Sequence, residues 1–135
     1  MTSTLKINTL TGVTTAGSIA VTGEGNSTTT NLQQGLAKAF AWVDHRVDNA
    51  IDNGFNTASL TDTSAGISSV NITNAMQSVS QVTQITSYQS GTAQISGTGA
   101  DSMTSTTALK VVTNDTGSTG QEDTEYGITL HGDLA

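Results

Sequence analysis

From position 54 to the C-terminus, the chain is a succession of short segments in which Val, Ile and Tyr alternate with Ser and Thr. Clusters of Ser, Thr, Gly, Asp and Asn separate these segments. Short alternating strands at a spacing of about ten residues, joined by turn residues, are typical of antiparallel sandwiches. We therefore predict a mainly β protein whose residues 54–135 form an antiparallel, jelly-roll-like β-sandwich. The candidate strands are 55–61, 67–73, 79–88, 92–96, 108–113 and 126–131.

The candidate strand at 79–88 is ambiguous. Apolar residues recur there at every third position, a pattern that fits a helix nearly as well as a strand: Met76, Val79, Val82, Ile85 and Tyr88. The dominance of Val, Thr and Ile, which favour pleated strands, decides for a strand.

The apolar content leaves little material for a core. Val, Ile, Leu and Phe contribute 27 of the 135 residues, whereas Ser and Thr contribute 41. An apolar share near 20% approaches the range of chains that stay disordered, although a net charge of −7 is too dilute to enforce disorder. The chain has no cysteine that could staple a small fold. Stabilisation by oligomerisation is therefore expected.

Residues 1–31 are predicted to form an extended N-terminal arm. Two short stretches alternate apolar and polar residues, and glycines separate them. Two short strands cannot bury a face by themselves, so they need a partner surface. The predicted anchoring residues of the arm are Leu5, Ile7, Ile19 and Val21.

Residues 32–53 are predicted to form a short amphipathic helix that serves as an oligomerisation segment. Apolar residues follow one another at intervals of four, three, four and three positions, as in the seam of a coiled coil. Thr30 or Asn31 offers an N-cap, and Gly54 offers a stop. Two heptads are too short to form a coiled coil alone, so the seam must face either another subunit or the sandwich. The predicted interface residues are Leu36, Phe40, Val43, Val47 and Ala50.

Charge and hydropathy exclude several functions. The four cations of the chain are dispersed and form no basic patch for a phosphate backbone, so neither nucleic acid nor an acidic membrane surface is an expected partner. The longest apolar run, 39–43, is far shorter than the roughly 20 residues of a membrane-spanning helix. The N-terminus lacks the basic and apolar regions of a secretory signal, so none is expected.

No catalytic, metal or cofactor site is predicted. His45 and His131 lie in different modules, and the serine-rich sequence lacks a nucleophile elbow. Asp44, Asp48 and Asp52 would share one stripe of the predicted helix, which either faces water or holds a cation. The few aromatic residues are expected to pack in the core rather than to stack on a ligand. The chain is therefore expected not to be an enzyme and to need no cofactor.

Several stretches, in succession, resemble a known class of proteins. They are residues 12–39 with the following Trp42, residues 55–62, residues 70–76 and residues 126–133. Together they resemble small fibre-like or decoration virion structural proteins of marine tailed bacteriophages. The chain departs from this pattern between Val43 and Gly54, where the relatives carry a glycine-bearing β-turn. A shorter helix, with residues 47–55 in a strand, therefore stays open.

The resemblance implies a non-enzymatic β-module that assembles as a trimer on the surface of a particle. Such a protein would be made in the host cytoplasm and would bind the major capsid protein or other virion proteins. The leading expectation is a capsid decoration protein or short head fibre. The alternative is a tail-fibre or receptor-binding protein whose loops at 97–101 and 114–125 touch a host-surface glycan or protein. The acidic charge suits the outside of a particle, because packaged DNA would repel it inside.

Overall fold

The chain forms two compact units, Met1–Leu36 and Ala37–Ala135. The computed structural model describes residues 4–12, 19–22, 29–88, 94–97, 103–115 and 120–135. The first unit contains the whole predicted arm. The second unit begins upstream of position 54, because it includes two strands from the segment predicted to be helical.

Within its described residues, the N-terminal unit contains two short strands and one helical turn. Strands β1 (Ala20–Thr22) and β2 (Thr29–Asn31) form a short antiparallel pair. One helical turn, α1 (Leu32–Gly35), follows β2 directly. The backbone N–H of Leu32 donates a hydrogen bond to the carbonyl of Ile19 at 2.9 Å, which joins the turn to the strand pair.

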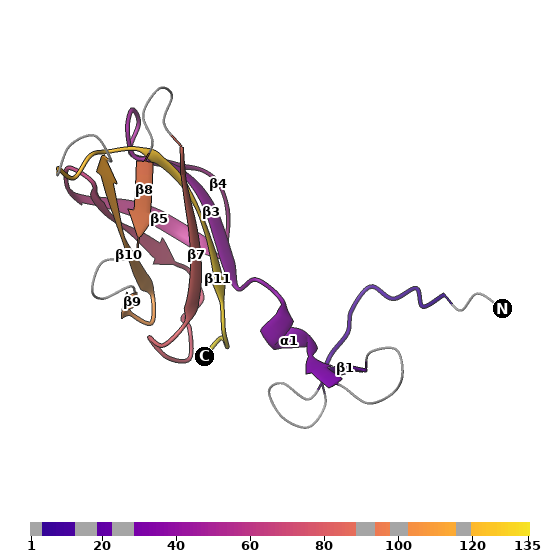
Figure 1. Ribbon diagram of the computed structural model, residues 1–135. Helices are drawn as coiled ribbons and strands as arrows, with labels where there is room; N and C mark the ends of the chain where they lie inside the picture. Colours follow the sequence, from indigo (N-terminus) through magenta and orange to yellow (C-terminus); the bar gives the residue numbers. More distant parts are fainter. Residues whose placement is uncertain (1–3, 13–18, 23–28, 89–93, 98–102, 116–119) are drawn as a thin grey trace. The chain divides into compact units, whose positions relative to one another are not determined.

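The second unit is built from two antiparallel sheets (Figure 1). The four-stranded sheet has the order β4-β3-β11-β7. The five-stranded sheet has the order β5-β6-β10-β8. Strand β9 also pairs with β10, at the opposite end of β10 from β8. The bounds of the first sheet are β3 (Ala39–Asp44), β4 (Ala50–Phe55), β7 (Val82–Tyr88) and β11 (Glu125–His131). Those of the second are β5 (Thr57–Ser64), β6 (Ile67–Ile72), β8 (Gln94–Gly97), β9 (Met103–Ser105) and β10 (Ala108–Asp115).

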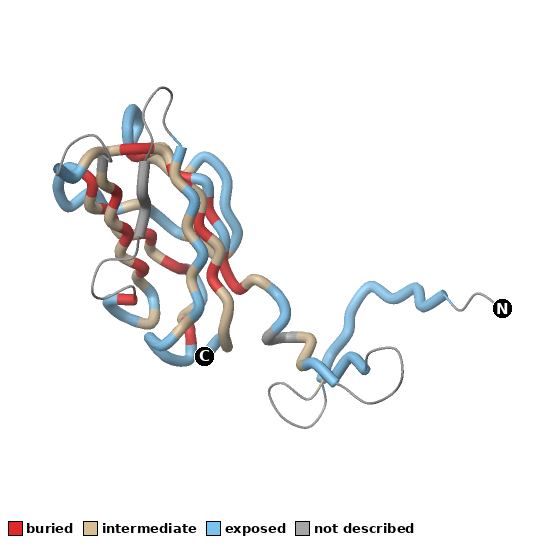
Figure 2. The backbone as a smooth tube through the Cα atoms, in the orientation of Figure 1, coloured by how far each residue is buried: buried red, intermediate tan, exposed pale blue. Residues whose placement is uncertain are grey.

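The core lies between the sheets, and Figure 2 shows buried positions on strands of both sheets. Strands β3, β6 and β11 each alternate buried with less buried positions, as a strand with one covered face requires. The phenol oxygen of Tyr126 on β11 lies 2.6 Å from the hydroxyl of Ser68 on β6, so this polar contact joins the two sheets. The apolar core side chains that are fully buried include Tyr126, Met76, Leu109, Leu130, Val43, Val70 and Val111.

The prediction of a mainly β, antiparallel sandwich is confirmed. Strands β6, β10 and β11 fall within two residues of their predicted ranges. The ambiguous segment at 79–88 contains strand β7, so the choice of a strand over a helix is also confirmed. The short strand β9 was not predicted, and residues 92 and 93 of another candidate lie outside the described residues.

The helix predicted for residues 32–53 is wrong. Apart from the single turn α1, this segment forms the antiparallel hairpin β3–β4. Residues 39–44 alternate small inward-facing residues with Phe40 and Trp42, which face outward. Pairing with β4 on one side and β11 on the other decides the structure of β3, and this tertiary context overrides the local spacing.

The hairpin scatters the five residues of the predicted seam. Val43 points into the core of the sandwich, whereas Phe40 lies on the opposite face of the same strand. Val47 is exposed in the turn between β3 and β4, and Leu36 belongs to the N-terminal unit. These residues therefore share no apolar stripe, and the predicted helical seam is not formed.

Candidate functional site

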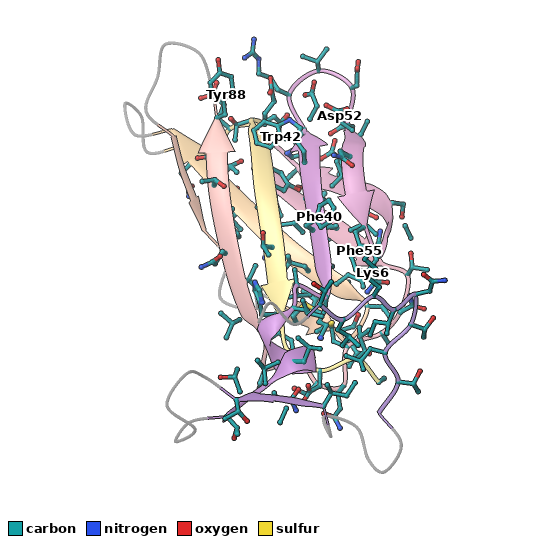
Figure 3. The ribbon with its side chains drawn as sticks, turned by 90° about the vertical axis from the view of Figure 1, so that its right-hand side faces the viewer. Lys6, Phe40, Trp42, Asp52, Phe55 and Tyr88 are labelled. Carbon is teal, nitrogen blue, oxygen red and sulfur yellow. The ribbon has the colours of Figure 1, made fainter. Side chains whose placement is uncertain are left out.

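The outer face of the four-stranded sheet carries a cluster of exposed aromatic side chains. The register places Phe40 on β3 directly opposite Phe55 on β4, and Trp42 opposite Gly127 on β11. Figure 3, which looks onto this sheet, shows Phe40, Trp42 and Phe55 on the same side of it. We call these three residues the aromatic strip. A contiguous group of exposed large apolar side chains is unusual on a soluble domain and marks a binding surface.

Each ring of the aromatic strip is held at the surface and keeps a substantial exposed area. The exposed fractions are 41% for Phe40, 38% for Trp42 and 53% for Phe55. The rings of Phe40 and Phe55 are stacked, with centroids 5.9 Å apart and an angle of 26° between their planes. Such a pair restrains both rings, although both side chains stay exposed.

Gly127 determines how Trp42 lies on the sheet. A Cβ atom at position 127 would lie 3.3 Å from Cε3 and 3.5 Å from Cζ3 of the indole. The six-membered ring of Trp42 therefore rests against the backbone of β11, at the place where a side chain would otherwise stand. The absence of a side chain at position 127 leaves room for the ring to lie low across the strand.

Polar side chains surround the aromatic strip. The β3–β4 ladder shifts register between Trp42 and Val43, so β4 carries one extra residue, Asp52, between Ile51 and Asn53. Asp52 and Asn53 are exposed beside Trp42, and Thr86 is exposed on β7 at the position that pairs with Gly127. The four strands of this sheet contain the acids Asp44, Asp52 and Glu125 and neither Lys nor Arg. The face thus combines apolar rings with hydrogen-bonding groups and carboxylates.

The predicted acidic stripe does not form. Asp44 ends β3 and accepts hydrogen bonds from the backbone N–H groups of Arg46 and Val47 at 2.9 and 2.8 Å, so it stabilises the turn. Asp48 lies in that turn and Asp52 lies at the bulge of β4. Within the part of the chain that the structure describes, no group of three or more His, Asp or Glu side chains is placed to hold a metal ion.

His45 and His131 lie at opposite ends of the ladder between β3 and β11. His45 is almost completely buried, and its ring lies between two carboxylates. Its Nε2 lies 3.3 Å from Asp62 Oδ1, and its Nδ1 lies 3.5 Å from Asp123 Oδ1. Asp123 also accepts a hydrogen bond of 2.6 Å from the backbone N–H of Gly66. His45 therefore joins the β3–β4 turn to β5 and to the segment that precedes β11.

The predicted anchoring residues lie in the N-terminal unit. Leu5, Ile7 and Val21 are exposed there, and Ile19 is half-buried. Of the predicted receptor-binding loops, residues 98–101 and 116–119 lie outside the described residues. None of the described helical segments has the length and hydropathy to cross a membrane.

Sequence reasoning missed the aromatic strip because it assigned Phe40 and Trp42 to a helix. The signal for a strand was present in the order Ala39-Phe40-Ala41-Trp42-Val43, where small residues alternate with aromatic ones. The two alanines are core residues, but their small size hid the inward face of the strand. Compared with models of known protein families, with curated proteins and with solved structures, the chain matches none of them.

Proposed function

We propose that this protein is a non-enzymatic structural protein on the surface of a bacteriophage virion. In this proposal it is a trimeric capsid decoration protein or short head fibre, made in the host cytoplasm. The N-terminal unit attaches to the major capsid protein and stabilises the shell, while the jelly-roll-like sandwich is displayed. The sequence resemblance to fibre-like virion proteins supports this assignment.

One structural observation carries the proposal. The chain divides into a sandwich with its own core and a small N-terminal unit in which several apolar side chains are exposed. Leu5 is 79% exposed, and Ile7, Leu10, Val21 and Leu36 are also exposed. A partner that covers such apolar side chains stabilises the complex, because each Å² of apolar surface removed from water contributes about 25 cal/mol of favourable free energy. An exposed strand pair can also extend a neighbouring sheet.

The copy number of the protein in purified particles tests this proposal. Gel densitometry against the major capsid protein should give a copy number of hundreds per particle. Recombinant protein should elute as a trimer when its mass is measured by light scattering. A few copies per particle would contradict decoration of the capsid, and a folded monomer at micromolar concentration would contradict the trimer.

The aromatic strip favours a second candidate function, which is attachment to a host surface by a tail-fibre or receptor-binding protein. Exposed Trp and Phe side chains are enriched where proteins bind partners. In this case, a low copy number would accompany binding of recombinant protein to host cells and inhibition of infection.

A further inference from the structure

We propose that the aromatic strip, together with the polar side chains beside Trp42, is a binding site for a neutral glycan. This inference concerns the four-stranded sheet alone and does not depend on the N-terminal unit or on attachment to a capsid. It assigns to the sandwich a ligand class that the proposed structural role does not require.

The presentation of the rings is the first argument. One face of a pyranose ring is lined by C–H groups, and it packs against the negative face of an aromatic ring. The rings of Phe40 and Phe55 are stacked with their centroids 5.9 Å apart, and both side chains are exposed. Trp42 follows Phe40 after one intervening residue on β3, which places the next ring about 7 Å further along the strand. Successive rings along β3 thus offer an extended surface to consecutive sugar units.

The hydrogen-bonding groups beside Trp42 are the second argument. The register shift adds Asp52 to β4 and places it next to Asn53, which pairs with Trp42. Figure 3 shows Asp52 near the Trp42 end of the aromatic strip. A carboxylate accepts two hydrogen bonds from neighbouring hydroxyls, and an amide both donates and accepts. These two side chains suit the hydroxyl-rich edge of a sugar whose apolar face lies on the rings.

The charge of the face is the third argument, and it selects a neutral ligand. The four strands contain three carboxylates and no Lys or Arg. A phosphorylated, sulfated or uronic-acid polymer would be repelled, as would nucleic acid. Two copies of the sheet placed face to face would bring their carboxylates together, and like charges in an interface oppose association. A neutral glycan carries no charge that the carboxylates of the sheet would repel.

Trp42 provides a direct readout because it is the single tryptophan of the chain. The full-length protein is titrated with the neutral polysaccharides hydroxyethyl cellulose and galactomannan, and with the anionic polymers alginate and polygalacturonate. At least one neutral polymer is expected to change the intensity or wavelength of the Trp42 emission in a saturable way, whereas the anionic polymers do not. The same neutral polymer should retard the protein in a native gel.

Substitution of the ring locates the site. Trp42→Ala should weaken retardation in the gel at least about tenfold, since stacking on one aromatic side chain contributes that much to binding. Trp42→Phe should keep part of the affinity. Val47→Ala removes an exposed apolar side chain from the neighbouring turn and should leave retardation unchanged. Circular dichroism and thermal unfolding verify that each variant is folded.

Several results would overturn the proposal. It fails if no neutral polymer changes the Trp42 emission, or if the anionic polymers bind equally well. It also fails if retardation survives Trp42→Ala in a folded protein. An emission that shifts with protein concentration alone would show that a second copy of the chain covers the aromatic strip. None of these results bears on the particle copy number, so the proposed structural role is tested separately.

Discussion

Tyr126 illustrates how a single side chain stabilises a thin core. Burial raises the pKa of Tyr126 to about 12 from its usual 10.0, and the hydrogen bond with Ser68 only partly opposes this shift. The folded state thus favours the neutral phenol. Below pH 10 the phenol is neutral in both the folded and the unfolded chain, so the free energy of unfolding does not depend on its titration there. Above pH 10 the unfolded chain loses its proton before the folded chain does. The free energy of unfolding should therefore fall by roughly 1.4 kcal/mol per pH unit until about pH 12.

Urea denaturation at pH 9, 10 and 11 measures this loss. Tyr126→Phe serves as the matched variant, because it keeps the ring and removes the ionisable group. At pH 8 the variant should be less stable by about 1–2 kcal/mol, since the buried Ser68 hydroxyl loses its partner. Between pH 10 and 12 its stability should fall less steeply than that of the wild type. Equal slopes for the two proteins would contradict a raised pKa at Tyr126.

Gly66 is required by the turn between β5 and β6. Its φ angle is +66°, and a Cβ atom there would lie 2.5 Å from both the Glu122 nitrogen and the Thr113 carbonyl oxygen. Gly66→Ala should therefore lower the free energy of unfolding by more than about 1 kcal/mol, because neighbouring backbone must move. Gly35→Ala is the control, since no atom beyond the adjoining residues and the backbone of its own helical turn lies within 4 Å of the added methyl group. Thermal unfolding compares the two variants, and a similar melting temperature for both would contradict this account.

The predicted helical seam and the observed hairpin β3–β4 imply different effects for substitutions at Val43 and Val47. Val43→Asp should destabilise the sandwich by about 4 kcal/mol or more, because the carboxylate would be buried between the sheets without a partner. Val47→Asp should change stability by less than about 0.5 kcal/mol, because Val47 is 70% exposed in the turn. Denaturant unfolding measures both. Equal effects, accompanied by dissociation of an oligomer, would instead support a helical seam.

Alternation along the strands was sufficient to predict the sandwich, because β6, β10 and β11 have one covered face and one open face. The hairpin β3–β4 could not be predicted in this way. Its inward residues include two alanines, and its turn depends on the side chain of Asp44 and on Asn49 with a positive φ of 50°. The grouping of Phe40, Phe55 and Trp42 depends on the pairing of strands and on a bulge, which only the folded chain specifies.

The proposed function gives the two compact units, Met1–Leu36 and Ala37–Ala135, separable roles. Leu5→Asp combined with Ile7→Asp should abolish attachment to capsids that lack the protein, because charged residues would replace the exposed apolar contacts. Co-sedimentation with such capsids measures attachment. The melting temperature of the sandwich should stay unchanged, since its core begins at Ala39. The control is Trp42→Ala, which should attach normally. Normal attachment of the doubly substituted protein would contradict the anchoring role of the arm.

The thin apolar content of the chain is consistent with this division of roles. Within the described residues, the buried apolar side chains form one cluster inside the sandwich, whereas Leu5, Ile7, Leu10, Val21 and Leu36 of the N-terminal unit are exposed. The core that stabilises the fold therefore lies in the sandwich, and the proposed function leaves attachment to the first unit.

Cryo-electron microscopy of intact particles shows whether the protein decorates the capsid. Density for the sandwich is expected on the outside of the capsid shell, in groups of three, with the N-terminal segment in contact with the major capsid protein. Density at the tail tip alone, or particles that lack the protein, would contradict this expectation.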